Sequence, residues 1–261
     1  MQEAAPISHS GAEYRSHADR ACRKIRPALR PRGRGSGRHQ VQHNWHCHWS
    51  ETGEGEVTVE NDYRSRFNTV LHPIADALET LLKDLLEGQA RIDRISTRPK
   101  SVDRFVAKAN AKIGENPKYV DPLHQIQDQI GARIITFYKD DVGRVSEIVQ
   151  KYFHSIESKD ILPEKVWEFG YFGNHHVLML PKDVIDQSFD PNLVPDFFEL
   201  QIKTLFQHAW SEANHDLGYK PGNQSLDDDE LRQLAFTSAQ AWGADKIFND
   251  LFQKRDAAVE N

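Results

Sequence analysis

The sequence predicts an α/β domain, in which helices and strands alternate along the chain and pack as layers. Over residues 67–86, apolar side chains recur at spacings of three and four, which is typical of an amphipathic helix. Residues 131–138 read GARIITFY, a β-branched and aromatic run typical of a strand. Residues 198–204 read FELQIKT and place apolar side chains at alternate positions, as in a strand with one buried face. These patterns together indicate a sheet covered by helices.

The remaining elements follow from the same patterns and from helix-capping residues. Gly88 ends the first helix. Ser101, Asp140 and Thr204 stand where side-chain oxygens cap the starts of later helices. The expected strands are 90–97, 131–138, 176–180 and 197–202. The expected helices are 67–86, 101–112, 140–153, 204–217 and 231–252.

Composition divides the chain into two parts. Residues 1–56 are rich in Arg, Gly, His and Pro without any apolar period, so we expect a disordered basic extension over 1–60 and one folded domain over 61–255. The first 50 residues carry nine Lys or Arg and three acidic residues, whereas the whole chain has a net charge of −6. The folded part is therefore acidic and poorly suited to general nucleic-acid binding. A nucleic-acid-binding arm remains an alternative interpretation of the extension.

The sequence contains no signal for membrane insertion or secretion. No apolar run approaches the ~18 residues needed to span a bilayer, and the N-terminal region has no apolar signal-peptide core. Cys22 and Cys47 cannot form a disulfide framework and show no paired zinc spacing. The histidines beside Cys47 are interpreted as incidental, because structural zinc ligands normally come from two separated knuckles. We therefore expect a cytoplasmic protein without a membrane partner.

Acidic residues near two strands suggest metal-assisted chemistry. In the strand 198–204, Glu199, Gln201 and Lys203 share the face opposite the apolar one. Asp128 stands just before the strand 131–138. It is either a capping carboxylate or, with an acid on a neighbouring strand, a ligand for Mg²⁺, which prefers carboxylates and substrate phosphates.

Two further stretches suit a nucleotide. Arg98, Lys100 and Lys108 surround the start of the helix 101–112, whose N-terminal dipole also attracts phosphate. A solvated basic helix face is the alternative interpretation. The stretch GYFGNHH at 170–176 places Tyr171 next to a glycine on a bent loop, where its ring would either stack on a purine base or fill a turn.

Taken in order, these stretches resemble the synthetase domain of the RelA/SpoT family, which makes the alarmone (p)ppGpp. Five blocks carry the resemblance: RPKS at 98–101 with Lys108, DQIGARI at 128–134, GYFGNH at 170–175, ELQIKT at 199–204 and HAWSEANHDLGYK at 208–220. The family fold is similar to that of the polymerase β nucleotidyltransferases. The resemblance therefore implies an α/β (α+β) domain with a mixed, twisted sheet of about five strands and helices on its faces.

The resemblance also implies an activity, that of a GTP diphosphokinase of the small alarmone synthetase type. Such an enzyme transfers pyrophosphate from ATP to the ribose 3′-hydroxyl of GDP or GTP and releases AMP. Arg98 matches the position that stacks on adenine, and Lys100 and Lys108 match positions that hold the ATP phosphates. Asp128 matches the Mg²⁺ ligand, and Glu199 matches the second carboxylate, which helps to hold the metal or activates the hydroxyl.

On the acceptor side, Tyr171 matches the residue that stacks on guanine. His175, Gln201 and Arg133 match positions in or near the acceptor site. Gly173 stands where the family usually has serine, and Lys203 stands where it usually has arginine. These departures concern the acceptor more than the transfer, because both carboxylates are present.

Two alternatives to this activity remain. Some small relatives act as toxins that pyrophosphorylate the tRNA 3′ end or make adenosine alarmones, which would bring in tRNA or an antitoxin as a partner. A non-catalytic nucleotide- or RNA-binding protein is a second alternative. Separately, we expect a homo-oligomer, because the apolar residues of the last helix cover more than one face. They are Leu231, Leu234, Phe236, Trp242, Ile247, Phe248, Leu251 and Phe252.

Overall fold

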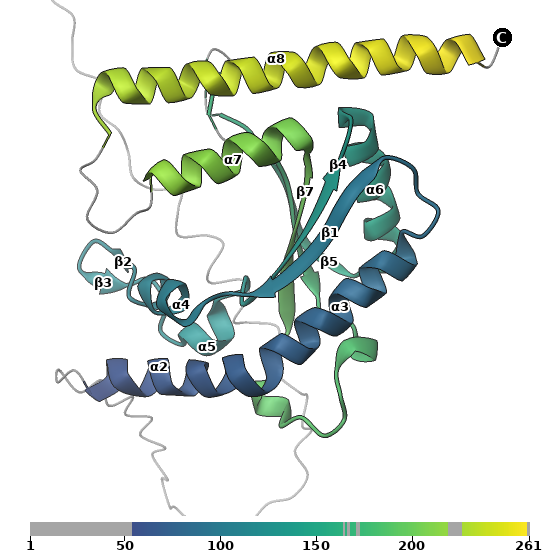
Figure 1. Ribbon diagram of the computed structural model, residues 1–261. Coiled ribbons are helices and arrows are strands. Elements are labelled where there is room, and N and C mark those ends of the chain that lie inside the picture. The colour runs from purple at the N-terminus through teal and green to yellow at the C-terminus, as the bar shows by residue number, and fades with distance from the viewer. Residues whose placement is uncertain (1–53, 164, 166–167, 171–172, 219–225, 260–261) are drawn as a thin grey trace, which may run out of the picture. The chain divides into compact units, whose positions relative to one another are not determined.

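The computed structural model describes residues 54–163, 165, 168–170, 173–218 and 226–259 (Figure 1). The expected extension over residues 1–60 lies mostly outside these ranges, and the division of the chain at residue 60 stays a prediction. Residues 54–60 are described and are helical, so helical structure begins earlier in the chain than the sequence patterns predicted.

The described residues alternate between helices and strands. The strands are β1 (Ile92–Pro99), β2 (Lys112–Ile113), β3 (Asn116–Pro117), β4 (Ile130–Thr136), β5 (Ser155–Ile161), β6 (Gly173–Met179) and β7 (Phe197–Thr204). The α-helices are α2 (Glu54–Arg66), α3 (His72–Leu85), α4 (Val102–Ala109), α5 (Pro122–Gln125), α6 (Lys139–Tyr152), α7 (Leu205–Gly218) and α8 (Asp228–Val259). A π-helical segment (Phe67–Leu71) joins α2 to α3, and short 3-10 turns occupy Lys182–Val184 and Pro191–Leu193.

Five strands form one mixed sheet in the order β1-β4-β7-β6-β5. Strands β4 and β7 are parallel, and the other neighbouring pairs are antiparallel. The alternating strand patterns at 131–138 and 198–204 correspond to β4 and β7, which lie side by side near the middle of the sheet. The predicted α/β mixed sheet is therefore confirmed.

One face of the sheet is the hydrophobic core. Alternate residues of β4 and β7 are buried there with side chains from α3 and α6. These include Ile130, Ala132, Ile134, Phe198, Leu200, Ile202, Ile74, Leu78, Val145 and Val149. Burying an aliphatic or aromatic side chain contributes ~1.5–3 kcal/mol. Because side chains alternate along a strand, the residues between these core positions all point to the opposite face.

The opposite face of the sheet is partly covered by α7, beside which α8 lies (Figure 1). Helix α7 begins with a reciprocal cap, in which Thr204 Oγ1 accepts a hydrogen bond from Gln207 N at 3.1 Å and Gln207 Oε1 accepts one from Thr204 N at 2.9 Å. Thr204 thus ends β7 and caps α7, as the sequence predicted. Among the described helices, none is long and apolar enough to cross a membrane.

Several boundaries differ from the sequence-based expectations. Helix α4 ends at Ala109, because the chain turns at once into the β2–β3 hairpin. Strand β5 was not predicted: its sequence, SIESKDI, is mostly polar, and most of its residues are exposed or half-buried at the edge of the sheet. Helix α8 runs from Asp228 to Val259, longer at both ends than the apolar residues indicated.

Candidate active site

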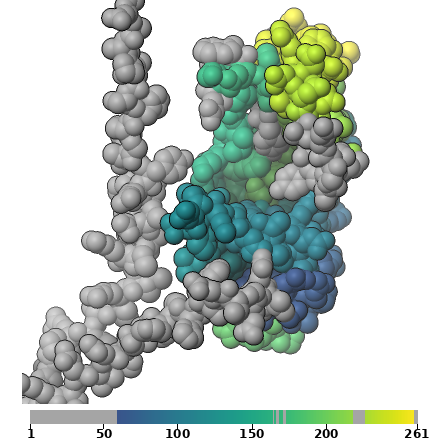
Figure 2. Space-filling model, turned by 90° about the vertical axis from the view of Figure 1, so that its left-hand side faces the viewer, coloured from purple at the N-terminus to yellow at the C-terminus, as the bar shows by residue number. Residues whose placement is uncertain are grey.

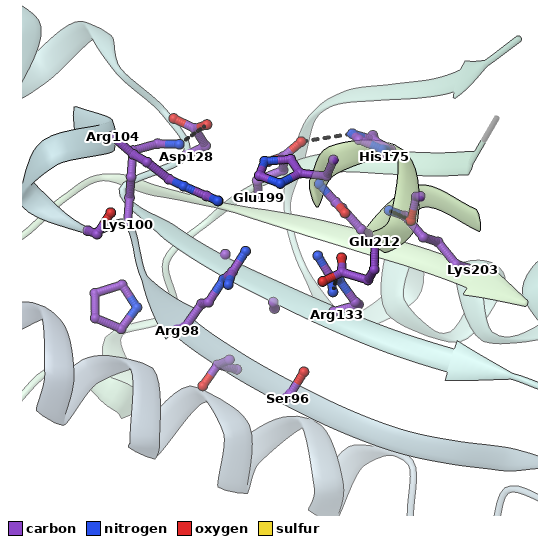
Figure 3. Close-up of a pocket in the computed structure, with 18 of the residues that line it drawn as sticks. Ser96, Arg98, Lys100, Arg104, Asp128, Arg133, His175, Glu199, Lys203 and Glu212 are labelled. Atoms are coloured by element: carbon purple, nitrogen blue, oxygen red, sulfur yellow. Dashed lines mark hydrogen bonds and ion pairs between the residues drawn. The ribbon is translucent and has the colours of Figure 1, made fainter. Parts of the chain in front are cut away.

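A pocket of about 820 Å³ opens on the face of the sheet that α7 partly covers (Figure 3). Strand register explains its composition. Arg98 on β1 pairs with Gly131 on β4, which pairs with Glu199 on β7. Two residues further along β4 and β7, Arg133 pairs with Gln201, which pairs with His175 on β6. Four adjacent strands therefore present polar side chains on the same face and at the same level.

One end of the pocket holds a carboxylate between two lysines. Lys100 Nζ and Lys108 Nζ each lie 2.9 Å from Asp128 Oδ2. Burial alone would raise the pKa of Asp128, but the two ammonium groups outweigh it and hold the pKa of this carboxyl below its ordinary value. The other oxygen of the same carboxylate, Oδ1, is buried and makes no hydrogen bond with the described residues.

Helix α2 fixes the backbone around this carboxylate. The Tyr63 hydroxyl donates a hydrogen bond to the Lys100 carbonyl at 2.7 Å, and the Tyr63 ring stacks on Phe105 of α4. Lys100 N in turn donates to the Gln129 carbonyl at 2.8 Å. Gln129 follows Asp128 in the sequence, and its Oε1 accepts a hydrogen bond of 3.0 Å from the buried Arg66 guanidinium. Helix α2 thereby connects the segment of Lys100 with the segment of Asp128.

The other end of the pocket holds the second carboxylate. His175 Nδ1 lies 2.8 Å from Glu199 Oε1 (Figure 3). Burial would raise the pKa of Glu199, and the negative charge of Asp128 acts in the same direction. Hydrogen bonds from His175 and Gln201 outweigh these effects, so the pKa of Glu199 lies below its ordinary value. Both carboxylates therefore carry negative charge at neutral pH.

The two carboxylates suit a hard divalent cation that also binds substrate phosphates. They line one pocket and affect each other electrostatically. Asp128 Oδ1 is buried and has no protein partner among the described residues, and a carboxylate oxygen is the kind of ligand that Mg²⁺ prefers. Within that part of the chain, no group of three or more metal-ligating side chains occurs. Two carboxylates are enough for Mg²⁺, which commonly takes its other ligands from water and phosphate.

Helix α7 supplies pocket residues to which sequence analysis gave no role. Glu212 Oε1 lies 2.8 Å from Arg133 Nη1. His208 does not line the pocket, but its Nδ1 lies 3.5 Å from the same nitrogen. Ser211 Oγ accepts a hydrogen bond from the buried Lys203 Nζ at 3.3 Å. Helical spacing could have identified this face, because residues 208, 211, 212 and 215 recur at intervals of three and four.

Arg104 is another pocket residue to which sequence analysis gave no role, a cation on α4 that lies near Arg98 and His215. It lies four residues before Lys108, on the same side of α4, which the same spacing rule would have indicated. The pocket therefore contains more positive charge than the sequence blocks alone suggested.

Most of the predicted site residues are brought together. Those that line the pocket are Arg98, Lys100, Asp128, Arg133, His175, Glu199 and Gln201. Lys108 reaches the same place through its ion pair with Asp128. Tyr171 lies outside the described residues. The roles of these residues stay predictions.

Part of this chain is similar in sequence to a known protein family. Residues 97–224 match the family described as the region found in RelA / SpoT proteins. A curated relative, GTP pyrophosphokinase YjbM of Bacillus subtilis, is 31% identical over 139 residues, which cover 51% of this chain and 60% of that protein. The match thus spans less than two thirds of the relative's length.

Solved structures share the fold. Small alarmone synthetase 1 from Bacillus subtilis superposes with a TM-score of 0.59 at 21% identity, covering 77% of this chain and 99% of that one. A structure of the same enzyme bound to its product pppGpp gives a TM-score of 0.58 at 21% identity, covering 76% and 99%. A GTP pyrophosphokinase family protein from Streptococcus pneumoniae gives 0.57 at 21% identity, covering 79% and 97%. Residues 97–224, about half of this chain, thus resemble the region found in RelA / SpoT proteins, and the fold is that of the small alarmone synthetases.

Proposed function

We propose that this chain is a cytoplasmic GTP diphosphokinase, which transfers pyrophosphate from ATP to the 3′-hydroxyl of GDP or GTP and so makes (p)ppGpp. The observation that carries the proposal is the pairing of two carboxylates, Asp128 and Glu199, in one pocket with Lys100 and Lys108 beside the first. The curated relative named above as a GTP pyrophosphokinase supports the same activity.

The basic end of the pocket is the proposed ATP site. Arg98 is solvent-exposed at the pocket wall and would stack on adenine, while Lys100 and Lys108 would hold the phosphates. In the free protein these two ammonium groups neutralise Asp128. When a nucleotide and a metal ion bind, the lysines can pair with the phosphates and the Asp128 carboxylate with the cation, so the local charge changes little. Mg²⁺ held by Asp128 and Glu199 would offset negative charge on the transferred group.

The other end is the proposed acceptor site, formed by Tyr171, His175, Gln201 and Arg133. Glu199 lies at this end, next to His175, and either helps to hold the metal or accepts the proton of the attacking 3′-hydroxyl. In the transfer, a bond forms between that oxygen and the β-phosphorus of ATP. The bond from the β-phosphorus to the oxygen of the α-phosphate breaks, and AMP leaves.

An acceptor assay tests the proposal. The purified full-length chain is incubated with Mg²⁺ and ATP labelled at the γ-phosphate, together with GDP, GTP, ADP or an uncharged tRNA. We expect label to move to GDP and GTP. Label that moves only to ADP or to the tRNA 3′ end would instead indicate a toxin-type synthetase, and binding of ATP without any transfer would indicate a non-catalytic binder.

Substitution of the two carboxylates tests their roles. We expect Asp128→Asn and Glu199→Gln each to lower kcat by at least ~100-fold, because each removes a charge that acts on the transferred group. Binding of a non-hydrolysable ATP analogue should change by less than ~10-fold for Glu199→Gln, since the phosphate-binding lysines remain. Asp84→Asn, which alters an exposed carboxylate on α3 away from the pocket, serves as the matched control. Unchanged turnover in either pocket variant would contradict the assignment.

A further inference from the structure

The most deeply buried side chains of helix α8 are polar rather than apolar. Ser238, Asp245 and Asn249 are 0%, 2% and 8% exposed, whereas Phe236 and Ile247 are 63% and 61% exposed. Spacings of seven and four residues place the three buried polar residues on one face of the helix. Figure 2 shows α8 (yellow-green) at the surface of the molecule.

Two of these polar contacts reach segments that carry the acceptor end of the pocket. Ser238 Oγ donates a hydrogen bond of 2.8 Å to the backbone carbonyl of Gly170. Asp245 Oδ2 accepts one of 2.8 Å from Thr204 Oγ1, at the last residue of β7, the strand of Glu199. Burial outweighs this hydrogen bond and raises the pKa of Asp245 to about 6.

A ring contact supports the first of these attachments. The Trp242 and Phe169 rings meet edge to face, with centroids 5.9 Å apart and planes at 66°. Trp242 lies one helical turn after Ser238, so the helix contacts two successive residues, Phe169 and Gly170, from one face. On the other side of this segment, the chain enters β6 at Gly173, and two residues later His175 contacts Glu199.

We infer that α8 is a positioning element for acceptor binding, and that the Ser238 hydrogen bond to Gly170 sets the backbone entering the acceptor side of the pocket. The inference rests on the proposed function, because it concerns how the acceptor nucleotide is held. The geometry is specific. A hydroxyl group that is fully buried and bonded to a main-chain carbonyl fixes the helix and the segment relative to each other, and loss of the hydroxyl leaves that carbonyl without its partner.

The test compares two neighbouring hydroxyl deletions in the full-length protein. Ser238→Ala removes the bond to Gly170. Thr237→Ala removes an exposed hydroxyl that contacts Trp210 and Leu234 instead. We expect Ser238→Ala to raise the KM for GDP or GTP by about 3- to 10-fold, the effect of one hydrogen bond, with kcat and the KM for ATP within about 2-fold of wild type. Thr237→Ala should leave both KM values within about 2-fold.

Hydrogen–deuterium exchange tests the attachment without relying on turnover. Peptides that span residues 168–176 should exchange faster in Ser238→Ala than in wild type or Thr237→Ala, while peptides from β4 stay unchanged. If wild type transferred no label to any acceptor, the proposed function would be wrong. The exchange data would still test whether Ser238 holds the segment at Gly170. Unchanged exchange of peptides 168–176 in Ser238→Ala would overturn the inference. So would a KM for GDP or GTP that rises equally in Ser238→Ala and Thr237→Ala, or a KM for ATP that rises as much as the KM for GDP or GTP.

Discussion

Lys203 is a buried lysine in the wall of the pocket, at a position where family members usually have arginine. Burial lowers the pKa of its ammonium group to about 8, and the neighbouring Arg133 acts in the same direction. The carboxylates of Glu212 and Glu199 act against this shift. An arginine would remain charged throughout the physiological range, whereas this lysine changes its charge close to it.

The resulting pH dependence is a testable difference from an enzyme with arginine. Lys203 is mostly protonated at about pH 7 and mostly neutral at about pH 9, so the pocket loses a positive charge as the pH rises. We expect the KM for GDP or GTP to rise about 10-fold over this range, because a charge a few ångströms from phosphate is worth ~1–2 kcal/mol. Initial rates at several pH values measure it.

Lys203→Arg is the matched variant for this prediction. It keeps the positive charge at alkaline pH, so its KM should stay within about 3-fold over the same range. An equal rise of KM in wild type and in Lys203→Arg would show that another group, or the nucleotide itself, is responsible.

Among whole elements, α2 has the clearest structural role, because one arginine of this helix joins three separate segments. The Arg66 guanidinium donates to the carbonyl of Leu123 at 2.7 Å, to Gln129 Oε1 at 3.0 Å and to the carbonyl of Asn192 at 2.9 Å. A planar guanidinium can make these bonds together, whereas a lysine ammonium cannot reach the same three acceptors from one rigid group.

We therefore expect Arg66→Lys to lower the free energy of unfolding by about 2–4 kcal/mol, because buried acceptors lose their partners. Urea denaturation followed by circular dichroism measures the change. Arg64→Lys is the control on the same helix, since the side chain of Arg64 is exposed and forms an ion pair with Glu60 one turn away. It should change stability by less than ~0.5 kcal/mol. Equal losses in the two variants would contradict the role given to Arg66.

The elements that sequence analysis identified are those with a regular apolar pattern. Strands β4 and β7 alternate clearly, and their polar positions, Arg133, Glu199 and Gln201, are the ones that line the pocket. Helix α2 has no such pattern. Its described buried side chains include Tyr63 and Arg66, which are held by stacking and by hydrogen bonds to distant backbone. Long-range polar contacts of this kind leave no local periodicity, so α2 and its link to Asp128 could not be predicted.

On the scale of the whole molecule, the surroundings of α8 explain why this helix has apolar residues on more than one face. Some of these residues have partners: Phe252 stacks on Tyr138 beneath the Arg91 guanidinium, and Phe248 stacks on Phe206. Even so, most of the large apolar residues of α8 remain largely exposed, because the buried face is occupied by polar residues. The exposed large apolar residues of α8 are Leu231, Phe236, Trp242, Ile247, Phe248 and Leu251.

An exposed apolar face on a long helix favours association with a second copy of the chain. Monomeric proteins seldom expose contiguous apolar patches of several hundred Å². We expect wild type to elute as a dimer or larger, with a mass by light scattering at least twice the chain mass of 30.0 kDa. The double variant Phe236→Glu/Ile247→Glu should be monomeric, because each substitution puts a charge into the interface. These two side chains avoid the buried polar face of α8, so the variant should keep its fold and its hydrogen bond to Gly170. A monomeric wild type at micromolar concentration would contradict the prediction, as would a double variant that associates as wild type does.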